Sequence, residues 1–363
     1  MKHWKRFAAS VMLCSLLSVA DAAAEFAFVS LRSGEAQVFV RDAQGRIQAV
    51  TEGTDFSVQP AWSSRGAFAF ARKTDGATRV YIQDAMLAPA RRVSEVEGWM
   101  EHGPSWSPDG SRLAYFAQAL RGGELELRLF EPATSRTVTL FKTGHGLGPS
   151  PVSWSSDGRK LVVIAAVGEP TAHVWLLSSD ATVPPRNISE ALVPRGARSA
   201  QIAPDGRSVA WVAALAERAP LLLTELDSLD TKDLTPKGVS QTDSPDWSPD
   251  GRRLVFAARL RFEETDNSEI LVVDTQTPST ARGPLNLSAH ESDDFHPRWS
   301  SDGSAVVFAS LRTGTSLLFE VEATGGVARP VSVHHSHDMA HAMRPQPFSQ
   351  ASSLSGLARS SNP

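Results

Sequence analysis

The stretch "PSWSPDG" at residues 104–110 recurs along the chain in five near-copies. The copies are "PAWSSRG" (60–66), "VSWSSDG" (152–158), "AQIAPDG" (200–206), "PDWSPDG" (245–251) and "PRWSSDG" (297–303). Their closing glycines are separated by 44, 48, 48, 45 and 52 residues, in the order Gly66, Gly110, Gly158, Gly206, Gly251 and Gly303. Regular spacing of this length indicates a repeat architecture rather than one isolated loop.

The same succession of short apolar runs follows each copy. After residue 110 the runs are "LAYFA" (113–117), "LELRLFE" (125–131) and "TVTLF" (137–141). They are rich in Val, Leu, Phe and Thr and are bounded by Gly, Pro, Asp and Ser, which is typical of strands. With the strand that carries the tryptophan, each unit becomes a four-stranded antiparallel sheet. The sequence therefore predicts an all-β protein, a β-propeller built from such blades.

The repeated turn has a structural explanation. Pro108 pre-sets φ at the first turn position, and the side chain of Asp109 can bond to nearby backbone N–H groups. Gly110 can adopt the left-handed conformation that returns the chain as a hairpin. Trp106 is expected to pack between neighbouring blades, where a large flat side chain buries much area. We therefore interpret the motif as part of the scaffold and not as a catalytic loop.

The two ends of the repeat region complement each other. Residues 26–51 contain the three later strands of a unit without a tryptophan strand, and "RPQPFSQ" (344–350) resembles a tryptophan strand with Phe348 in the place of the tryptophan. Joining them closes the ring with the C-terminal strand and leaves no free edge. The apolar second strands are expected to start near residues 26, 67, 113, 161, 209, 254 and 305. This number predicts seven blades, and six is the alternative if one unit is misread.

The chain divides into three parts. Residues 1–24 have a basic start, an apolar stretch and then small residues, which predicts a signal peptide and a periplasmic or secreted protein. The apolar stretch is shorter than the ~20 residues that a membrane span needs, so no membrane span is expected. Residues 25–350 form the predicted propeller domain, and 351–363 are predicted to be a disordered tail. Cys14 is the only cysteine, so the mature protein would contain neither disulfides nor thiolate chemistry.

Several functional classes lack their sequence signals. The formal net charge is −4, with lysines and arginines scattered, which argues against binding to nucleic acid. The sequence contains no G-x-S-x-G elbow of a hydrolase and no phosphate-binding glycine loop after a strand. These observations lead to the expectation that the protein is not an enzyme.

The W-S-P-D-G turn, the "LAYFA" strand and the "VYIQD" strand (80–84) together resemble the repeats of TolB-like propellers over residues 25–350. Related repeats occur in the propellers of prolyl-oligopeptidase-like peptidases and of oligogalacturonate lyases. The resemblance implies a periplasmic binding scaffold that contacts other proteins, with a peptidoglycan-associated lipoprotein as the partner it suggests. Two features depart from TolB. TolB carries an α/β domain before its propeller, whereas here the first predicted strand begins directly after the predicted signal peptide. The propeller of TolB has six blades, whereas seven are predicted here.

The candidate binding residues precede the innermost strands, where propellers usually hold ligands at one mouth of the central channel. Acids and histidines recur there at Asp55, Glu101, His102, His145, Asp243, Asp293, Asp294, His296, Asp338 and His341. The predicted binding set consists of Glu101, His102, Asp243, Asp294, His296, Asp338 and His341. The alternative is that these side chains cap turns or hold adjacent blades together.

A histidine-rich segment leaves a metal site open. The segment contains His334, His335, His337, Asp338 and His341, which are residue types that bind Zn²⁺. The alternative is a polar loop between the last strand and the closing strand. We expect no cofactor, with a divalent metal in the channel as the alternative. The predicted function is a protein-binding scaffold of the cell envelope, and the alternative is a metal-dependent propeller enzyme, either a polysaccharide lyase or a lactonase-like hydrolase.

Overall fold

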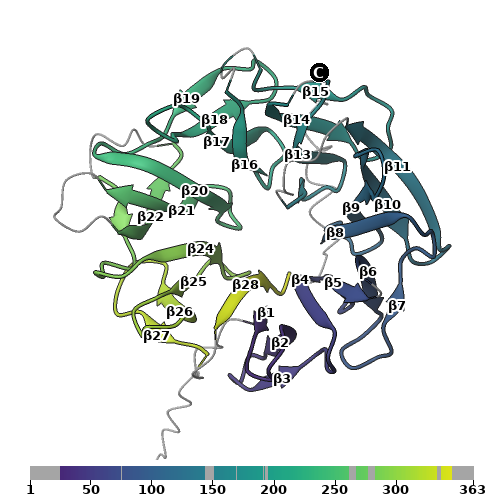
Figure 1. Ribbon diagram of the computed structural model, residues 1–363. Coiled ribbons are helices and arrows are strands. Elements are labelled where there is room, and N and C mark those ends of the chain that lie inside the picture. The colour runs from purple at the N-terminus through teal and green to yellow at the C-terminus, as the bar shows by residue number, and fades with distance from the viewer. Residues whose placement is uncertain are drawn as a thin grey trace, which may run out of the picture.

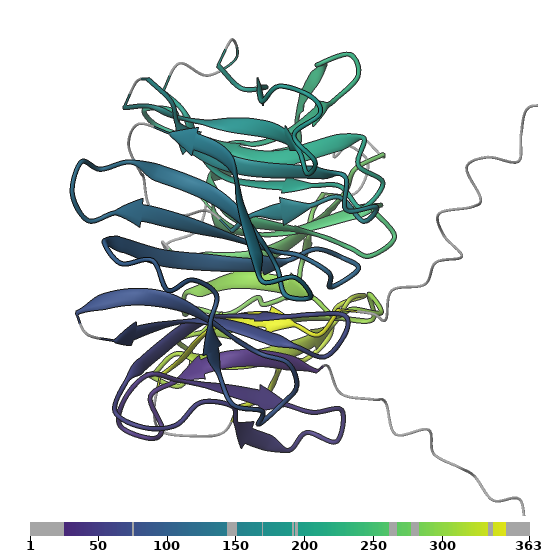
Figure 2. The same ribbon diagram turned by 90° about the vertical axis from the view of Figure 1, so that its right-hand side faces the viewer.

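Seven four-stranded antiparallel sheets surround a central axis in the computed structural model (Figure 1). The structure describes residues 25–345 except 75, 144–150, 169, 191, 193–194, 261–266, 277–282 and 333–336. Every regular element in these ranges is a strand, and within them no helix is long and apolar enough to cross a membrane. Seen from the side, the strands run across the thickness of the ring (Figure 2). The predicted all-β propeller with seven blades is confirmed.

Three blades follow one another in the first half of the chain. Blade 2 consists of β4 (Phe56–Trp62), β5 (Phe68–Thr74), β6 (Ala77–Gln83) and β7 (Arg91–Arg92). Blade 3 consists of β8 (Trp99–Trp106), β9 (Leu113–Ala119), β10 (Leu125–Glu131) and β11 (Arg136–Thr143). Blade 4 consists of β12 (Ser153–Trp154), β13 (Lys160–Ala166), β14 (Ala172–Ser178) and β15 (Arg186–Asn187).

Three further blades follow in the second half. Blade 5 consists of β16 (Ala197–Ile202), β17 (Ser208–Ala213), β18 (Leu221–Glu225) and β19 (Thr231–Asp233). Blade 6 consists of β20 (Val239–Trp247), β21 (Arg253–Leu260), β22 (Ser268–Asp274) and β23 (Leu285–Asn286). Blade 7 consists of β24 (Asp294–Trp299), β25 (Ala305–Ser310), β26 (Leu317–Glu322) and β27 (Arg329–Pro330). The second strands begin within one residue of the positions that the sequence predicts.

Blade 1 joins the two ends of the described chain, as Figure 1 shows at the meeting of the purple and yellow strands. It consists of β1 (Phe26–Ser30), β2 (Gln37–Arg41), β3 (Ile47–Ala49) and the closing strand β28 (Asp338–Met343). Closure by the C-terminal strand is confirmed, but the prediction that 344–350 form this strand is wrong. The tryptophan position needs only a side chain that fills the gap between blades, and Met343 packs there against the apolar cluster between blades 7 and 1. Phe348 lies outside the described residues.

The hydrophobic core is divided among the contacts between consecutive blades. Between blades 2 and 3, for example, Val80, Trp106 and Phe130 belong to one buried cluster. The other repeat tryptophans occupy the same place between their own blades, which confirms the packing predicted from the motif. Burying one large apolar side chain stabilises the fold by about 1.5–3 kcal/mol, so each blade is held mainly by its neighbours.

The repeated turn forms as its sequence predicts. In blade 3 the N–H of Gly110 donates to the carbonyl of Ser107 at 2.8 Å, and Gly110 has a φ of 66°. Asp109 accepts hydrogen bonds from the hydroxyls of Ser107 and Ser111, both at 2.6 Å. Burial alone would raise the pKa of Asp109, but these hydrogen bonds outweigh it and hold the pKa below its usual value. The Ser64 hydroxyl donates to the Pro108 carbonyl at 2.7 Å, which ties this turn to blade 2.

Candidate functional site: the axial cavity

A β-bulge interrupts the innermost strand in most blades at the same place. The register shifts four to one residues before the tryptophan in β4, β8, β20 and β24, and shifts also occur in β16 and β28. The first bulge residue has a positive φ in four blades: Gln59 (53°), Gly103 (61°), Ser244 (50°) and His296 (53°). Residues other than glycine rarely adopt this conformation. Such bulges often re-aim side chains beside binding sites.

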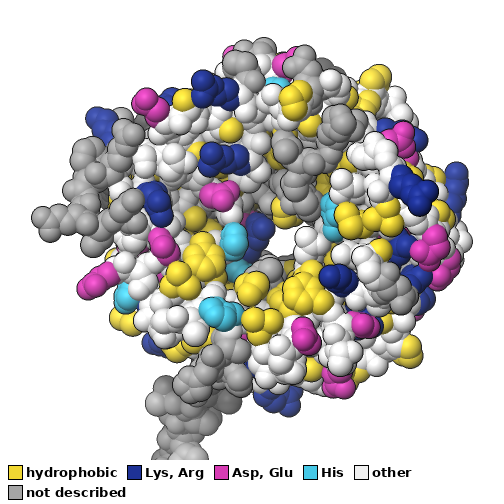
Figure 3. Space-filling view, in the orientation of Figure 1, with side chains coloured by type: hydrophobic (Ala, Val, Ile, Leu, Met, Phe, Trp, Pro, Cys, Tyr) yellow, Lys and Arg dark blue, Asp and Glu magenta, His cyan; other side chains and the backbone are white. Residues whose placement is uncertain are grey.

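The bulges surround a cavity of about 650 Å³ on the axis of the ring. Figure 3 shows the opening at its mouth. In most repeats two positions supply much of the wall: the bulge residue and the residue directly before the tryptophan or before the residue that takes its place. Lining residues at these positions are Gln59, Ala61, Gly103, Ser105, Ser199, Gln201, Ser244, Asp246, His296, Arg298 and Ala342.

The cavity has two chemically different walls. Blades 5 to 7 contribute hydroxyl, amide, imidazole and charged groups, including Gln201, Ser244 and His296. Blades 1 and 2 contribute mainly small and apolar side chains, such as Ala61 and Ala342. A ligand in this cavity would therefore meet polar groups on one side and apolar contacts on the other, as is usual in small-molecule and peptide sites.

An ion pair stands on the polar wall. The Nη1 of Arg298 in β24 donates to the Oδ1 of Asp246 in β20 at 3.1 Å, and the backbone N–H of Trp299 donates to Asp246 Oδ2 at 2.9 Å. The pair joins blades 6 and 7. Burial raises the pKa of Asp246, while the Arg298 guanidinium and the Trp299 N–H act in the opposite direction.

Two histidines lie next to this pair. His341 in β28 is buried, and its Nε2 is 3.2 Å from the carbonyl oxygen of Val307. Burial, assisted by Arg298 and His296, lowers the pKa of His341 to about 3. The pKa of His296 is also lowered, by loss of bulk water and by Arg298, although its side chain is exposed to the cavity. Both imidazoles are therefore neutral at pH 7, which leaves ring nitrogens that can accept or donate hydrogen bonds.

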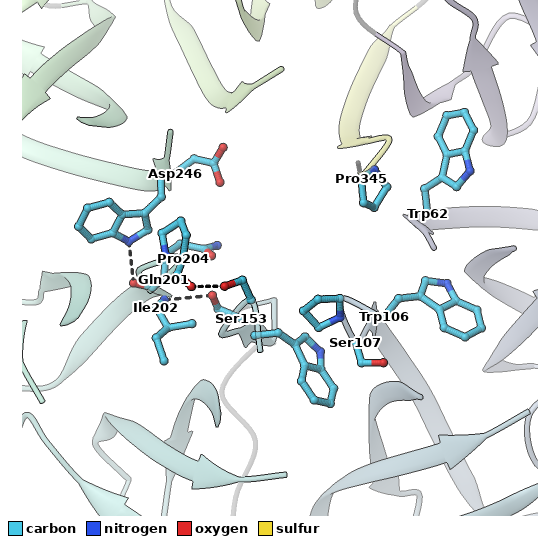
Figure 4. Close-up of a pocket in the computed structure, with 13 residues that line it drawn as sticks. Trp62, Trp106, Ser107, Ser153, Gln201, Ile202, Pro204, Asp246 and Pro345 are labelled. Atoms are coloured by element: carbon cyan, nitrogen blue, oxygen red, sulfur yellow. Dashed lines mark hydrogen bonds between the residues drawn. The ribbon is translucent and has the colours of Figure 1, made fainter. Parts of the chain in front are cut away.

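A second opening lies at the tryptophan end of the channel (Figure 4). Its volume is about 330 Å³, and Trp62, Trp106, Gln201 and Asp246 line both this opening and the first cavity. The indole N–H of Trp247 donates to the Gln201 carbonyl at 3.1 Å. The two openings therefore share one wall and form a channel along the axis.

Part of the predicted binding set lies at or near the cavity. His296 and His341 line it. Asp243 is exposed beside it and accepts hydrogen bonds from the Ser244 N–H at 2.7 Å and the Ser199 hydroxyl at 3.4 Å. His102 is half-buried against Phe116, and burial lowers its pKa. The binding role of these residues stays a prediction.

Two predicted aspartates face away from the channel, which corrects their expected placement at its mouth. Asp338 forms a salt bridge with Arg32 at 3.1 Å, and Asp294 forms the same pair with Arg312 at 3.1 Å. Both carboxylates are fully buried, and burial raises the pKa of Asp294. Asp294 lies before the bulge of β24 and the channel-facing His296 lies within it, so the shifted alternation sends the two side chains to different faces.

Glu101 is also displaced from the predicted channel mouth. Its side chain is fully buried between blades 2 and 3, and its Oε2 accepts a hydrogen bond from the N–H of Val80 at 3.1 Å. Burial raises its pKa. Of the other acids and histidines considered, Asp55 is exposed, Asp293 pairs with Arg259 at 3.9 Å, and His145 lies outside the described residues.

The sequence reasoning missed the residues that directly precede the tryptophan. Gln201, Asp246 and Arg298 occupy this position in three repeats, and all three line the cavity. A signal was present, because this position is Ala, Ser, Ser, Gln, Asp or Arg in the six copies, while the position after it is tryptophan in all but one of them.

A metal centre finds no support in the described part of the chain. Among those residues, no group of three or more His, Cys, Asp or Glu side chains could hold a metal ion. His334 and His335 of the histidine-rich segment lie outside the described residues. The predicted loop reading of this segment holds only in part, since residues 338–343 form β28.

Comparison with known proteins supports a TolB-like propeller. A family profile described as "TolB beta propeller domain" matches residues 195–349. The structure of TolB from Acinetobacter baumannii is 16% identical, and the match covers 90% of this chain and 68% of that chain with a TM-score of 0.54. An oligogalacturonate lyase from Vibrio parahaemolyticus is 15% identical, with coverage of 82% and 86% and a TM-score of 0.64. At such identities the structures establish the fold alone.

Sequence relatives carry peptidase names. Dipeptidyl-peptidase 5 from Trichophyton equinum is 33% identical over 94 residues, which are 25% of this chain and 13% of that protein. "Uncharacterized peptidase YuxL" from Bacillus subtilis (strain 168) is 28% identical over 167 residues, which are 46% of this chain and 22% of that protein. The matches thus span less than a quarter of either relative. These names contradict the expectation that the protein is not an enzyme, so that expectation is withdrawn.

Proposed function

We propose that this TolB-like β-propeller binds an extended polypeptide segment in its axial cavity. The proposal rests on one observation: the cavity of about 650 Å³ has polar and charged side chains on blades 5 to 7 and mainly small or apolar ones on blades 1 and 2. An extended segment presents apolar side chains together with backbone N–H and C=O groups, and each kind of group needs its own partner in the site.

The rim supplies the apolar part. Phe56 and Met339 are exposed, and Val58 and Phe295 are half-buried, at the start of the innermost strands of blades 7, 1 and 2. Figure 3 shows hydrophobic side chains gathered beside the opening on this side. Exposed apolar side chains that gather in one place are typical of interaction sites, whereas single ones are ordinary.

The polar wall supplies the hydrogen bonds. Arg298 has five N–H donors and uses one of them in its hydrogen bond to Asp246. Its remaining N–H groups, the Gln201 amide and the His296 ring can serve the carbonyl and carboxylate oxygens of a bound segment. The ion pair with Asp246 holds the guanidinium in place before the ligand arrives, which reduces the entropy lost on binding.

The peptidase names of the sequence relatives support a polypeptide as the ligand. They suggest two outcomes for the bound segment, which are release and hydrolysis. Both begin with the same binding step in the cavity, so an assay that follows binding and cleavage in one sample distinguishes them.

Binding is tested with fluorescein-labelled, carboxymethylated α-lactalbumin, an unfolded polypeptide, by fluorescence anisotropy. Met339→Asp places a charge on the apolar rim and should weaken binding about tenfold, since burying such a side chain is worth about 1.5–3 kcal/mol. Arg298→Gln should weaken it by a similar factor because a hydrogen bond to a charged group is lost. Mass spectrometry of the same samples reports cleavage.

The control is Val183→Asp, which changes an exposed apolar residue outside the group that lines the cavity. It should bind like the wild type. Equal affinities for all four proteins would refute the proposal, because neither the rim nor the wall would then contribute.

The proposal extends to the cell envelope. The export predicted from residues 1–24 and the TolB resemblance support an envelope ligand, and a peptidoglycan-associated lipoprotein is the first candidate to test. Fractionation of cells that express the full chain should recover it outside the cytoplasm. Recovery in the cytoplasm alone would contradict this part of the proposal and leave the binding assay unaffected.

A further inference from the structure

A second pocket lies between blades 2 and 3, away from the axis. Its volume is about 560 Å³, and it shares no lining residue with the axial cavity. One side is formed by the segment from Arg91 to Val96 at the end of blade 2, and the other by β10 and β11 of blade 3. The polypeptide binding proposed above does not use it.

The pocket is rich in guanidinium groups. Arg91, Arg92 and Arg128 line it, and Glu95 is the one acid among the lining residues. Three hydroxyl-bearing residues of β11 and the preceding turn add further hydrogen-bond donors and acceptors, and Phe130 adds an apolar surface. Clustered arginines form charge-assisted, frequently bidentate hydrogen bonds with carboxylates and phosphates.

One of these arginines is held firmly. The guanidinium of Arg128 stacks over the Trp99 ring with its carbon 4.2 Å from the ring centre, and its Nε donates to Glu126 Oε2 at 2.8 Å. Glu126 is itself bound by Lys142 at 2.8 Å. Arg128 is therefore orientated before any ligand binds, with its position set by packing as well as by charge.

The acids that pair with the other two arginines are exposed, and Arg92 Nε also donates to the Tyr81 hydroxyl at 3.3 Å. Arg91 pairs with Asp84 (72% exposed), and Arg92 pairs with Glu95 (82% exposed) and Glu97 (74% exposed). Exposed ion pairs of this kind contribute little to stability. An incoming anion can therefore replace these carboxylates at small cost.

Glu97 shows how a carboxylate fits. Its Oε2 accepts from Arg79 Nη2 at 2.6 Å and its Oε1 accepts from Arg92 Nη1 at 3.4 Å, so one carboxylate bridges two guanidinium groups. The side chain of Arg79 is only 4% exposed, whereas that of Glu97 projects into solvent. The buried partner is part of the fold, and the exposed partner is exchangeable.

Buried polar groups adjoin the pocket. Within the described part of the chain, Arg79 Nη1 is buried without a hydrogen-bond partner, whereas Glu101 interacts with Ser94 of the pocket and Tyr115 with Thr137 and Arg128. A buried polar atom without a partner is costly, and such atoms often mark the place of a ligand or water. Arg79 reaches from this buried group to the edge of the pocket through its bond to Glu97.

We propose that this pocket binds a ligand with two or more carboxylates. One carboxylate replaces Glu97 between Arg79 and Arg92, and another meets the fixed guanidinium of Arg128. The ligand is either a small polycarboxylate or the acidic side chains of a peptide, since both present the same group.

Isothermal titration of the full chain tests this site with two probes, citrate and a hexapeptide of glutamate. Arg92→Gln should weaken binding of whichever probe binds by about tenfold, because a charge-assisted hydrogen bond is lost. Glu97→Gln should tighten it about threefold, since the competing carboxylate is gone. Binding of citrate alone identifies a small ligand, and tighter binding of the hexapeptide identifies a peptide.

The matched control is Arg46→Gln, which removes an exposed arginine that pairs with Asp42 at 2.7 Å outside any such pocket. It should leave the affinities unchanged. The proposal is overturned if neither probe binds the wild type or Glu97→Gln at millimolar concentration, or if Arg46→Gln weakens binding as much as Arg92→Gln. Glu97→Gln alters an exposed side chain, so its gain of affinity can be read even if Arg92→Gln fails to fold.

Discussion

Single residues of the innermost strands have opposite roles although they are close in sequence. Asp294 is fully buried in a salt bridge with Arg312, while His296, two positions later, faces the axial cavity. In a regular strand these two side chains would share a face. The bulge that follows Phe295 changes this, because one extra residue shifts the alternation of all that come after it. Asp246 and Arg298 reach the axis for the same reason.

The buried His341 should make the free energy of unfolding depend on pH. Its pKa is about 3 in the fold and about 6.5 in the unfolded chain. Between these two pH values the imidazole is protonated in the unfolded state and neutral in the folded state. Stability from this residue is therefore complete above pH 6.5 and is lost toward pH 3. Between pH 7 and pH 5 the loss is about 2 kcal/mol.

Urea unfolding of the wild type and His341→Gln at pH 7 and pH 5 measures this effect. The variant lacks the titrating group, so its disadvantage relative to the wild type should shrink by about 2 kcal/mol at pH 5. A difference between the two proteins that stays the same at both pH values would show that the fold does not lower the pKa of His341.

At the scale of elements, the repeated turn links neighbouring blades. The backbone at Asp109 and Pro108 accepts hydrogen bonds from Arg65 and Ser64 of the preceding blade, at 2.6 and 2.7 Å. The same arrangement recurs where the Ser156 hydroxyl donates to the Pro204 carbonyl of the next blade. A motif that reads as a local hairpin in sequence is thus also a contact between blades.

Alanine in place of two equivalent glycines separates these two roles. Gly66 and Gly110 both have positive φ, 87° and 66°, so either substitution costs about 1 kcal/mol for the backbone conformation. A Cβ at Gly66 would meet nothing within 4 Å, whereas one at Gly110 would collide with the Ser63 hydroxyl and lie 2.9 Å from Arg65 Cγ.

Gly110→Ala should therefore lower the free energy of unfolding by at least about 1 kcal/mol more than Gly66→Ala, because the adjoining turn must move. Urea denaturation of both variants checks this difference. Equal losses would mean that the contact between the turns adjusts freely and that only the local hairpin matters.

At the scale of the whole molecule, closure of the ring depends on β28. This strand pairs with β1, where Met343 stands opposite Phe26, and the Arg32–Asp338 salt bridge adds a link at the other end of the pair. Without β28, strand β1 would become an open edge and Arg32 would lose a buried partner. The closure therefore lies before the residues that the sequence pattern indicated.

Two truncations distinguish the two closing segments. A chain that ends at residue 345 keeps β28 and should unfold at nearly the same temperature as the full chain. A chain that ends at 337 lacks β28, and its Tm should fall by about 10 °C or more, since several kcal/mol of packing and pairing are lost. Thermal unfolding by circular dichroism measures both. A large fall in the Tm of the chain that ends at residue 345 would instead assign the closure to residues after 345.

The repeat alone was enough to establish the architecture, because each unit carries its own turn, strands and interface tryptophan. Spacing of Gly66 through Gly303 predicted four-stranded blades, and the incomplete ends predicted a closed ring of seven. These features are local, so composition and order within about 45 residues suffice to specify them.

Only the tertiary structure decided which side chains meet. The bulges change the alternation of the innermost strands, so Asp246, Arg298 and His341 reach the axial wall while Glu101 goes to the contact between blades. The arginine pocket likewise combines residues of two blades that no single repeat contains. "PSWSPDG" specifies the blade, but sites between blades depend on register and on neighbours distant in sequence, and those are set only when the ring closes.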